Sequence, residues 1–141
     1  MLVKAVVDTN IWISALLNPA GAPRQIAERF EAEQFAIICS IELIAELANV
    51  MCRPKFASKI NSDQAKRFIA LLQRKTVLVQ LQDVPSVSRD PKDDVFLACA
   101  AVSDSDYLVS GDLDLLDLQT HGRTHIVCPA EFLEILEQQQ S

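Results

Sequence analysis

The chain of 141 residues lacks the patterns that mark several large classes of protein. No apolar stretch approaches the roughly 18 residues that a membrane span needs, and Lys4 and Asp8 do not fit a signal peptide. No two cysteines have the CxxC spacing, so we interpret all four as small buried apolar residues and not as a zinc site or a disulfide framework: Cys39, Cys52, Cys99 and Cys128. We therefore expect a cytoplasmic protein without a membrane anchor.

Internal repeats, low-complexity tracts and linkers are absent as well. The length and the apolar content of 50% suit one domain with a proper core, which we expect to span residues 1–141. The two histidines, His121 and His125, flank Gly122, which disfavours the helix that would place both imidazoles on one face. They are not expected to bind a metal ion.

Positive charge is also scarce, because 13 Lys and Arg residues face 19 Asp and Glu residues, for a formal net charge of -6. This balance argues against a surface built for general attraction of phosphate. Nucleic-acid binding would require a local basic patch or metal ions, and two divalent ions would change the net charge to about -2.

Short apolar runs rich in Val and Ile alternate with helical patterns along the chain. The expected strands are Leu2 to Val7, Phe35 to Cys39, Val77 to Val79, Tyr107 to Val109 and Thr124 to Val127. The expected helices cover residues 11–17, 23–33, 41–51, 63–74, 92–103, 113–118 and 130–138. This alternation predicts a three-layer α/β/α sandwich around a parallel five-stranded sheet, with ligands at the carboxyl ends of the strands.

Acidic residues stand where this sheet predicts a ligand site. Asp8 ends the first strand, and Asp112 follows the fourth after Ser110 and Gly111. Asp94 lies in the first turn of the helix that Asp90 can cap, and Glu46 lies at the edge of the apolar arc of its helix.

Four carboxylates at one edge would repel each other strongly. At a separation of about 6 Å and an effective dielectric of about 20, each pair would cost roughly 3 kcal/mol. Some must be protonated, or a cation must lie between them. Oxygen ligands without His or Cys favour Mg²⁺ or Mn²⁺ over zinc, and these ions suit phosphoryl chemistry.

Taken together, these segments resemble the PIN domain family of metal-dependent ribonucleases. The resemblance runs over nearly the whole chain. Within the family, the chain is most similar to the subgroup described as toxin components. It is carried by Val7-Asp-Thr-Asn10, Ser40-Ile-Glu-Leu-Ile-Ala-Glu46, Arg53-Pro-Lys-Phe56, Arg89-Asp-Pro-Lys-Asp-Asp94 with Phe96 to Ala100, and Tyr107-Leu-Val-Ser-Gly-Asp112 with Asp114.

The resemblance implies roles for particular residues. The family's acidic quartet maps onto Asp8, Glu46, Asp94 and Asp112, and Asp114 matches a frequent fifth acid that also suits the first turn of a helix. Asp94 is preferred over Asp93 because it stands three residues before Leu97 and Ala98, as in the family, whereas Asp93 can serve as a capping residue. Ser110 stands where the family more often has Thr, and both supply a hydroxyl.

Other residues near these acids are candidates for contact with substrate. Thr9 and Asn10 can form hydrogen bonds to it, or can serve only the turn. Arg89 and Lys92 flank the Asp93-Asp94 pair and can hold phosphate, or can be solvated. Trp12 can stack on a base, although its apolar neighbours favour a place in the core.

The leading functional hypothesis is an endoribonuclease that uses Mg²⁺ or Mn²⁺, with a catalytically weak PIN-like module that binds RNA or protein as the alternative. A haloacid-dehalogenase-like phosphatase is excluded by the order of the motifs, because the pair Asp93-Asp94 precedes Ser110. A response-regulator receiver needs a Lys where this chain has Cys128 and Pro129. The resemblance also implies an RNA substrate, a cognate antitoxin whose segment occupies the acidic groove, and a homodimer.

Overall fold

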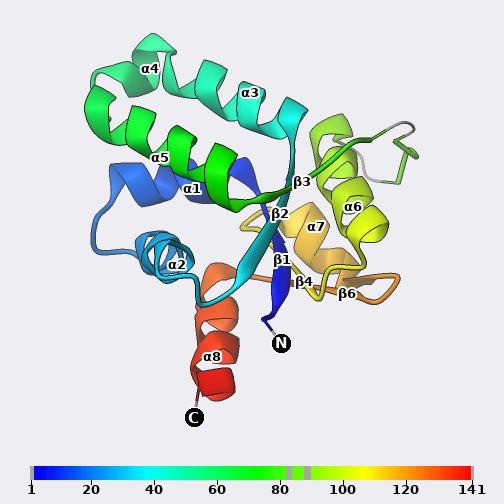
Figure 1. The fold of residues 1–141 in the computed structure, drawn as a ribbon. Coiled ribbons are helices and arrows are strands. Elements are labelled where there is room, and N and C mark those ends of the chain that lie inside the picture. The colour runs from blue at the N-terminus through cyan, green and yellow to red at the C-terminus, as the bar shows by residue number, and fades with distance from the viewer. Residues whose placement is uncertain (1, 82–83, 88–89, 141) are drawn as a thin grey trace.

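The computed structural model describes residues 2–81, 84–87 and 90–140. Within these residues one six-stranded sheet has the order β3-β2-β1-β4-β6-β5 (Figure 1). Its strands are β1 Lys4–Val7, β2 Ala36–Ser40, β3 Val77–Val79, β4 Tyr107–Val109, β5 Thr120–His121 and β6 Thr124–Val127. Strands β1, β2, β3, β4 and β6 are parallel to one another, as the alternating pattern predicted.

Helices connect the strands and cover both faces of the sheet (Figure 1). Their bounds are α1 Thr9–Leu17, α2 Ala22–Glu31, α3 Ile41–Met51, α4 Pro54–Ala57, α5 Ser62–Lys75, α6 Pro91–Ser103, α7 Leu113–Leu118 and α8 Pro129–Gln140. The prediction of an α/β sandwich is confirmed, and it missed only the short α4 among these helices.

Two apolar clusters hold the layers together because successive strand residues point to opposite faces. Ala5 and Val7 belong to a large cluster that includes side chains of α1, α2, α3, α5 and α8. Val6, between them, belongs to a smaller cluster that includes side chains of α6 and α7.

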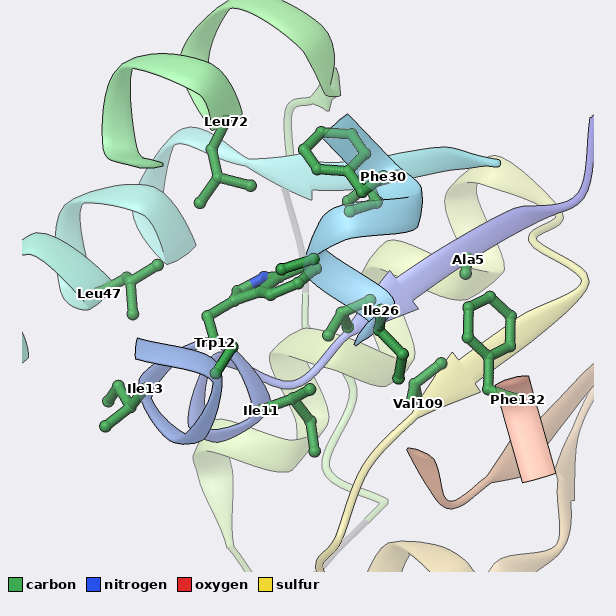
Figure 2. Close-up of a cluster of buried hydrophobic side chains, with 14 of the residues drawn as sticks. Ala5, Ile11, Trp12, Ile13, Ile26, Phe30, Leu47, Leu72, Val109 and Phe132 are labelled. Carbon is green, nitrogen blue, oxygen red and sulfur yellow. The ribbon is translucent and has the colours of Figure 1, made fainter. Parts of the chain in front are cut away.

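The larger cluster contains most of the aromatic residues. Trp12 is buried at 2% exposure, and its ring centroid lies 5.1 Å from that of Phe68 and 6.2 Å from that of Phe30. Figure 2 shows the indole among Ile26, Phe30 and other apolar side chains. The structure thus places Trp12 in the core.

The prediction of five strands was wrong, because β5 adds a sixth. Thr120 and His121 pair antiparallel with His125 and Thr124, and Gly122 turns the chain between them with a φ of +60°. A left-handed φ favours glycine, which has no Cβ. A two-residue strand is too short to show an alternating pattern, which explains why this segment resembled a loop.

The cysteine prediction was also wrong in part. Cys99 is buried and Cys39 and Cys128 are half-buried, whereas Cys52 is exposed just after α3.

The register of the sheet brings distant residues to one edge. Val7 pairs with Val109, the amide of Asp8 donates to the carbonyl of Val109 at 2.9 Å, and the amide of Ser110 donates to that of Val127 at 3.0 Å. Asp8 and Ser110 therefore follow the carboxyl ends of neighbouring strands.

Candidate functional site

Asp8 is buried between β1 and α1 with only 3% of its surface exposed. It is the N-cap of α1, and its Oδ1 accepts a hydrogen bond from the amide of Asn10 at 2.9 Å. Burial raises the pKa of Asp8; the hydrogen bonds from Asn10 and Ser110 oppose this effect, and the charges of Asp112 and Glu46 add to it. These bonds offset part of the cost of burying a carboxylate.

Ser110 connects two of the acids. Its buried Oγ donates to Oδ2 of Asp8 at 2.9 Å and accepts from the amide of Asp112 at 3.0 Å. Asp112 in turn caps α7, where its Oδ1 accepts from the amide of Asp114 at 2.9 Å. The end of β4 is thus ordered around the Asp8 carboxylate.

Asp93 brings a third carboxyl group to the same place. Asp90 caps α6 by accepting from the amide of Lys92 at 3.0 Å, and this cap puts Asp93 in the first turn. Asp93 is 3% exposed. Its pKa is raised to about 7, first by burial, then by the charge of Asp112 and a hydrogen bond with Asp112, and last by the charges of Asp90 and Asp8. A protonated Asp93 donates that bond, which reduces the repulsion between the acids.

Asp94, the next residue along α6, has different surroundings. Its Oδ1 accepts a hydrogen bond from the amide of Val87 at 2.9 Å, so its carboxylate is bonded to the segment that precedes the helix. Adjacent helical residues are rotated by about 100°. The structure thus brings Asp93, and not the predicted Asp94, together with Asp8 and Asp112.

Glu46 approaches from α3. It is half-buried, and its Oε1 lies 3.1 Å from Nζ of Lys92, which has 60% of its side chain exposed. An ion pair with so exposed a partner contributes about 0–1 kcal/mol. Lys92 therefore contacts an acid of the site in this structure.

These side chains line a hollow of about 250 Å³, which we call the acidic recess. Thr9 and Asn10 line it too, together with five acids: Asp8, Glu46, Asp90, Asp93 and Asp112. Ser110 acts through its bonds to Asp8 and Asp112. Asp114 is exposed on α7 and does not line the recess, and the predicted Arg89 lies outside the described residues.

The possible metal ligands of the recess are carboxylate oxygens, which is the type of ligand that a hard divalent cation prefers. Their present spacing does not complete a site: among the described residues, no three His, Cys, Asp or Glu side chains are grouped closely enough to hold a metal ion. Asp8, Asp93, Asp112 and Glu46 are the residues that would hold it. A small approach of these side chains, or release of Glu46 by Lys92, would be needed.

The sequence did not place Asp93 in the recess. Asp93 was interpreted as a capping residue because it stands three residues after Asp90, and the same position puts it in the first turn of α6. Arg53, Lys55 and Phe56 also line the recess, from the start of α4. Only the tertiary fold brings this segment to the carboxyl edge.

A parallel α/β sheet with buried acids at its carboxyl edge defines a class of domains that bind ligands at that edge. The model of the PIN domain family matches residues 4–114, so the chain belongs to this family. PIN domains are generally nucleases, and they typically use divalent metal ions.

A curated relative extends the similarity over the rest of the chain. Uncharacterized protein MJ1680 of Methanocaldococcus jannaschii is 26% identical over 144 residues, which cover 96% of this chain and 92% of the relative. Its name assigns no activity. Separately, none of the helices described in the structure is long and apolar enough to cross a membrane.

Proposed function

We propose that the chain is a metal-dependent endoribonuclease that hydrolyses phosphodiester bonds of RNA in the acidic recess. The observation that carries the proposal is the joining of Asp8, Asp93 and Asp112 at the carboxyl edge, through Ser110 and the bond between Asp93 and Asp112. A divalent ion bound there would activate water and stabilise negative charge on the phosphate.

The protein's own residues supply binding and orientation. Ser110 and the amide of Asn10 hold the Asp8 carboxylate in one position through its two oxygens. Burial and the charge of Asp112 raise the pKa of Asp93, and loss of the Asp93 proton would leave its carboxylate available as a ligand beside that of Asp112. No histidine lines the recess among the described residues, so the groups available to position water and phosphate are its acids, Thr9 and Asn10, and the cations Arg53, Lys55 and Lys92.

The experiment is a cleavage assay on RNA with Mn²⁺, with Mg²⁺ and with a chelator. We expect cleavage only with a divalent ion, and we expect Asp8→Asn to abolish it. Asp117→Asn removes an exposed acid of α7 outside the recess and is the matched control. Cleavage that survives both the chelator and Asp8→Asn would contradict the proposal.

A catalytically weak binding module is the second candidate. It is favoured by the absence of three closely grouped acids among the described residues and by the contact of Lys92 with Glu46. Binding of RNA without cleavage under all of the metal conditions would support this candidate over the nuclease.

The biological role that we propose is that of a toxin, with a cognate antitoxin as partner and a homodimer as the assembly. The proposal rests on the resemblance of the motifs, and a basic antitoxin side chain would suit a recess lined by five acids. Growth arrest on expression of the wild type, absent with Asp8→Asn, tests the role. Light scattering tests the dimer, and a monomer would contradict it.

A further inference from the structure

Three cations line the recess beside its five acids: Arg53, Lys55 and Lys92. Arg53 is the N-cap of α4 and Lys55 lies in its first turn, and both are exposed. They line the same hollow as the buried residues Asp8 and Asp93. In a chain with a net charge of -6, cations at this place are not explained by a generally basic surface.

Among the described residues, neither Arg53 nor Lys55 is paired with a carboxylate. The ion pairs found among the described residues join Arg29 to Glu137, Lys75 to Glu33, Lys92 to Glu46 and Arg123 to Asp106. Arg53 and Lys55 take part in none of them, although acids line the same recess. Their charges are therefore available to an anionic ligand, whereas that of Lys92 is partly neutralised by Glu46.

The backbone that carries these cations is held in place. The amide of Arg53 donates to the carbonyl of Val50 at 3.1 Å, and the carbonyl of Arg53 accepts from Phe56 and Ala57 at 2.9 and 2.8 Å. Phe56 packs against the larger apolar cluster, and Nζ of Lys55 lies 5.4 Å from the centroid of its ring. The two cationic side chains thus extend from the start of α4, whose backbone is held by these hydrogen bonds.

We infer that Arg53 and Lys55 bind the phosphodiester backbone of single-stranded RNA beside the phosphate that enters the recess. This inference rests on the proposed function, because it assigns the binding of that reaction's substrate. Cations on the wall attract the flanking phosphates and so offset their repulsion by the acids.

The geometry favours a single strand. Asp8 and Asp93 are each 3% exposed, so a phosphate must enter the recess to reach them. A single strand can turn its backbone into a hollow of about 250 Å³, whereas base pairing holds the backbone of a duplex in a regular helix.

The test measures binding of a short labelled RNA of mixed sequence to the full chain that carries Asp8→Asn, so that cleavage does not interfere. The first double variant combines Arg53→Gln and Lys55→Gln. The control double variant combines Lys59→Gln and Arg74→Gln, and it removes the same charge from exposed residues that do not line the recess. Melting temperatures verify that all variants fold.

We expect the Arg53 and Lys55 variant to bind on the order of tenfold more weakly. The slope of log K against log salt should decrease by about 0.7 per lost contact, or about 1.4 in total, while the control pair binds like its parent. A duplex of the same sequence should compete at least tenfold more weakly than the single strand.

Equal affinity and slope in the two double variants would overturn the inference, and equal competition by duplex would overturn the preference for a single strand. The proposed function fails separately. If the wild type does not cleave RNA while binding still depends on Arg53 and Lys55, the nuclease proposal is contradicted and the proposed binding site is supported. If the wild type cleaves RNA and binding does not depend on these two residues, only the proposed binding site is contradicted.

Discussion

The hydroxyl of Ser110 donates a 2.9 Å hydrogen bond to Oδ2 of Asp8, although 102 residues separate the two in the chain. The same oxygen accepts from the amide of Asp112, so one buried side chain orders two acids. The bond exists because β1 and β4 are neighbours in register, with Val7 opposite Val109. It fixes a carboxylate at the carboxyl edge of the sheet.

Ser110→Ala should therefore weaken both the fold and the site. Asp8 and the amide of Asp112 each lose a partner, and we expect the free energy of unfolding to decrease by about 1–3 kcal/mol in urea denaturation. The response of the melting temperature to Mn²⁺ should decrease too. Ser105→Ala is the matched control: it removes another buried hydroxyl, bonded to Ser103 at 2.6 Å, and should leave the metal response unchanged. Equal metal responses in both variants would contradict this role of Ser110.

The raised pKa of Asp93 makes the stability of the metal-free protein depend on pH. The pKa is about 7 in the folded protein against a reference value of 3.8, so between these values the folded state binds a proton that the unfolded state has released. Stability from this group is complete below about pH 4 and is lost as pH rises toward 7. We expect the difference in unfolding free energy between the wild type and Asp93→Asn to change over this range. A difference independent of pH would contradict the assignment.

Divalent ions should stabilise the protein by binding among the acids. At a concentration 100 times Kd, a bound ion adds about 2.7 kcal/mol, or roughly 8 °C in Tm for a chain of this size. Asp8→Asn should raise Tm without metal, because it removes a buried charge, and should reduce the shift that Mn²⁺ causes. Differential scanning fluorimetry measures both, with Asp117→Asn as the control. The absence of any shift with Mn²⁺ or Mg²⁺ would contradict the metal site.

Trp12 provides a check on the core that is independent of the recess. It is the single tryptophan, and its ring packs near Phe30 and Phe68 at 2% exposure. We expect blue-shifted fluorescence that resists quenching by acrylamide and does not respond to RNA. Trp12→Ala should destabilise the fold by about 3–5 kcal/mol. Quenching by RNA without loss of structure would instead indicate stacking on a base.

The sequence predicted the parts of the molecule that depend on local pattern. Asp8 and Asp112 were placed at the carboxyl edge because each follows an apolar strand. The choice between Asp93 and Asp94 could not be made in this way, since it depends on the rotation of α6 against the sheet. The bond from Val87 to Asp94, like the approach of Arg53 and Lys55 to the recess, arises only from tertiary packing.

Cleavage of single-stranded RNA in Mn²⁺ by the wild type, Asp93→Asn and Asp94→Asn tests the central claim most directly. The two substitutions are chemically identical and adjacent, but only Asp93 shares the recess with Asp8 and Asp112. The account predicts cleavage by the wild type, a loss on the order of 100-fold in Asp93→Asn and a loss below about tenfold in Asp94→Asn. It is contradicted if the wild type does not cleave, or if Asp94→Asn loses the activity that Asp93→Asn retains.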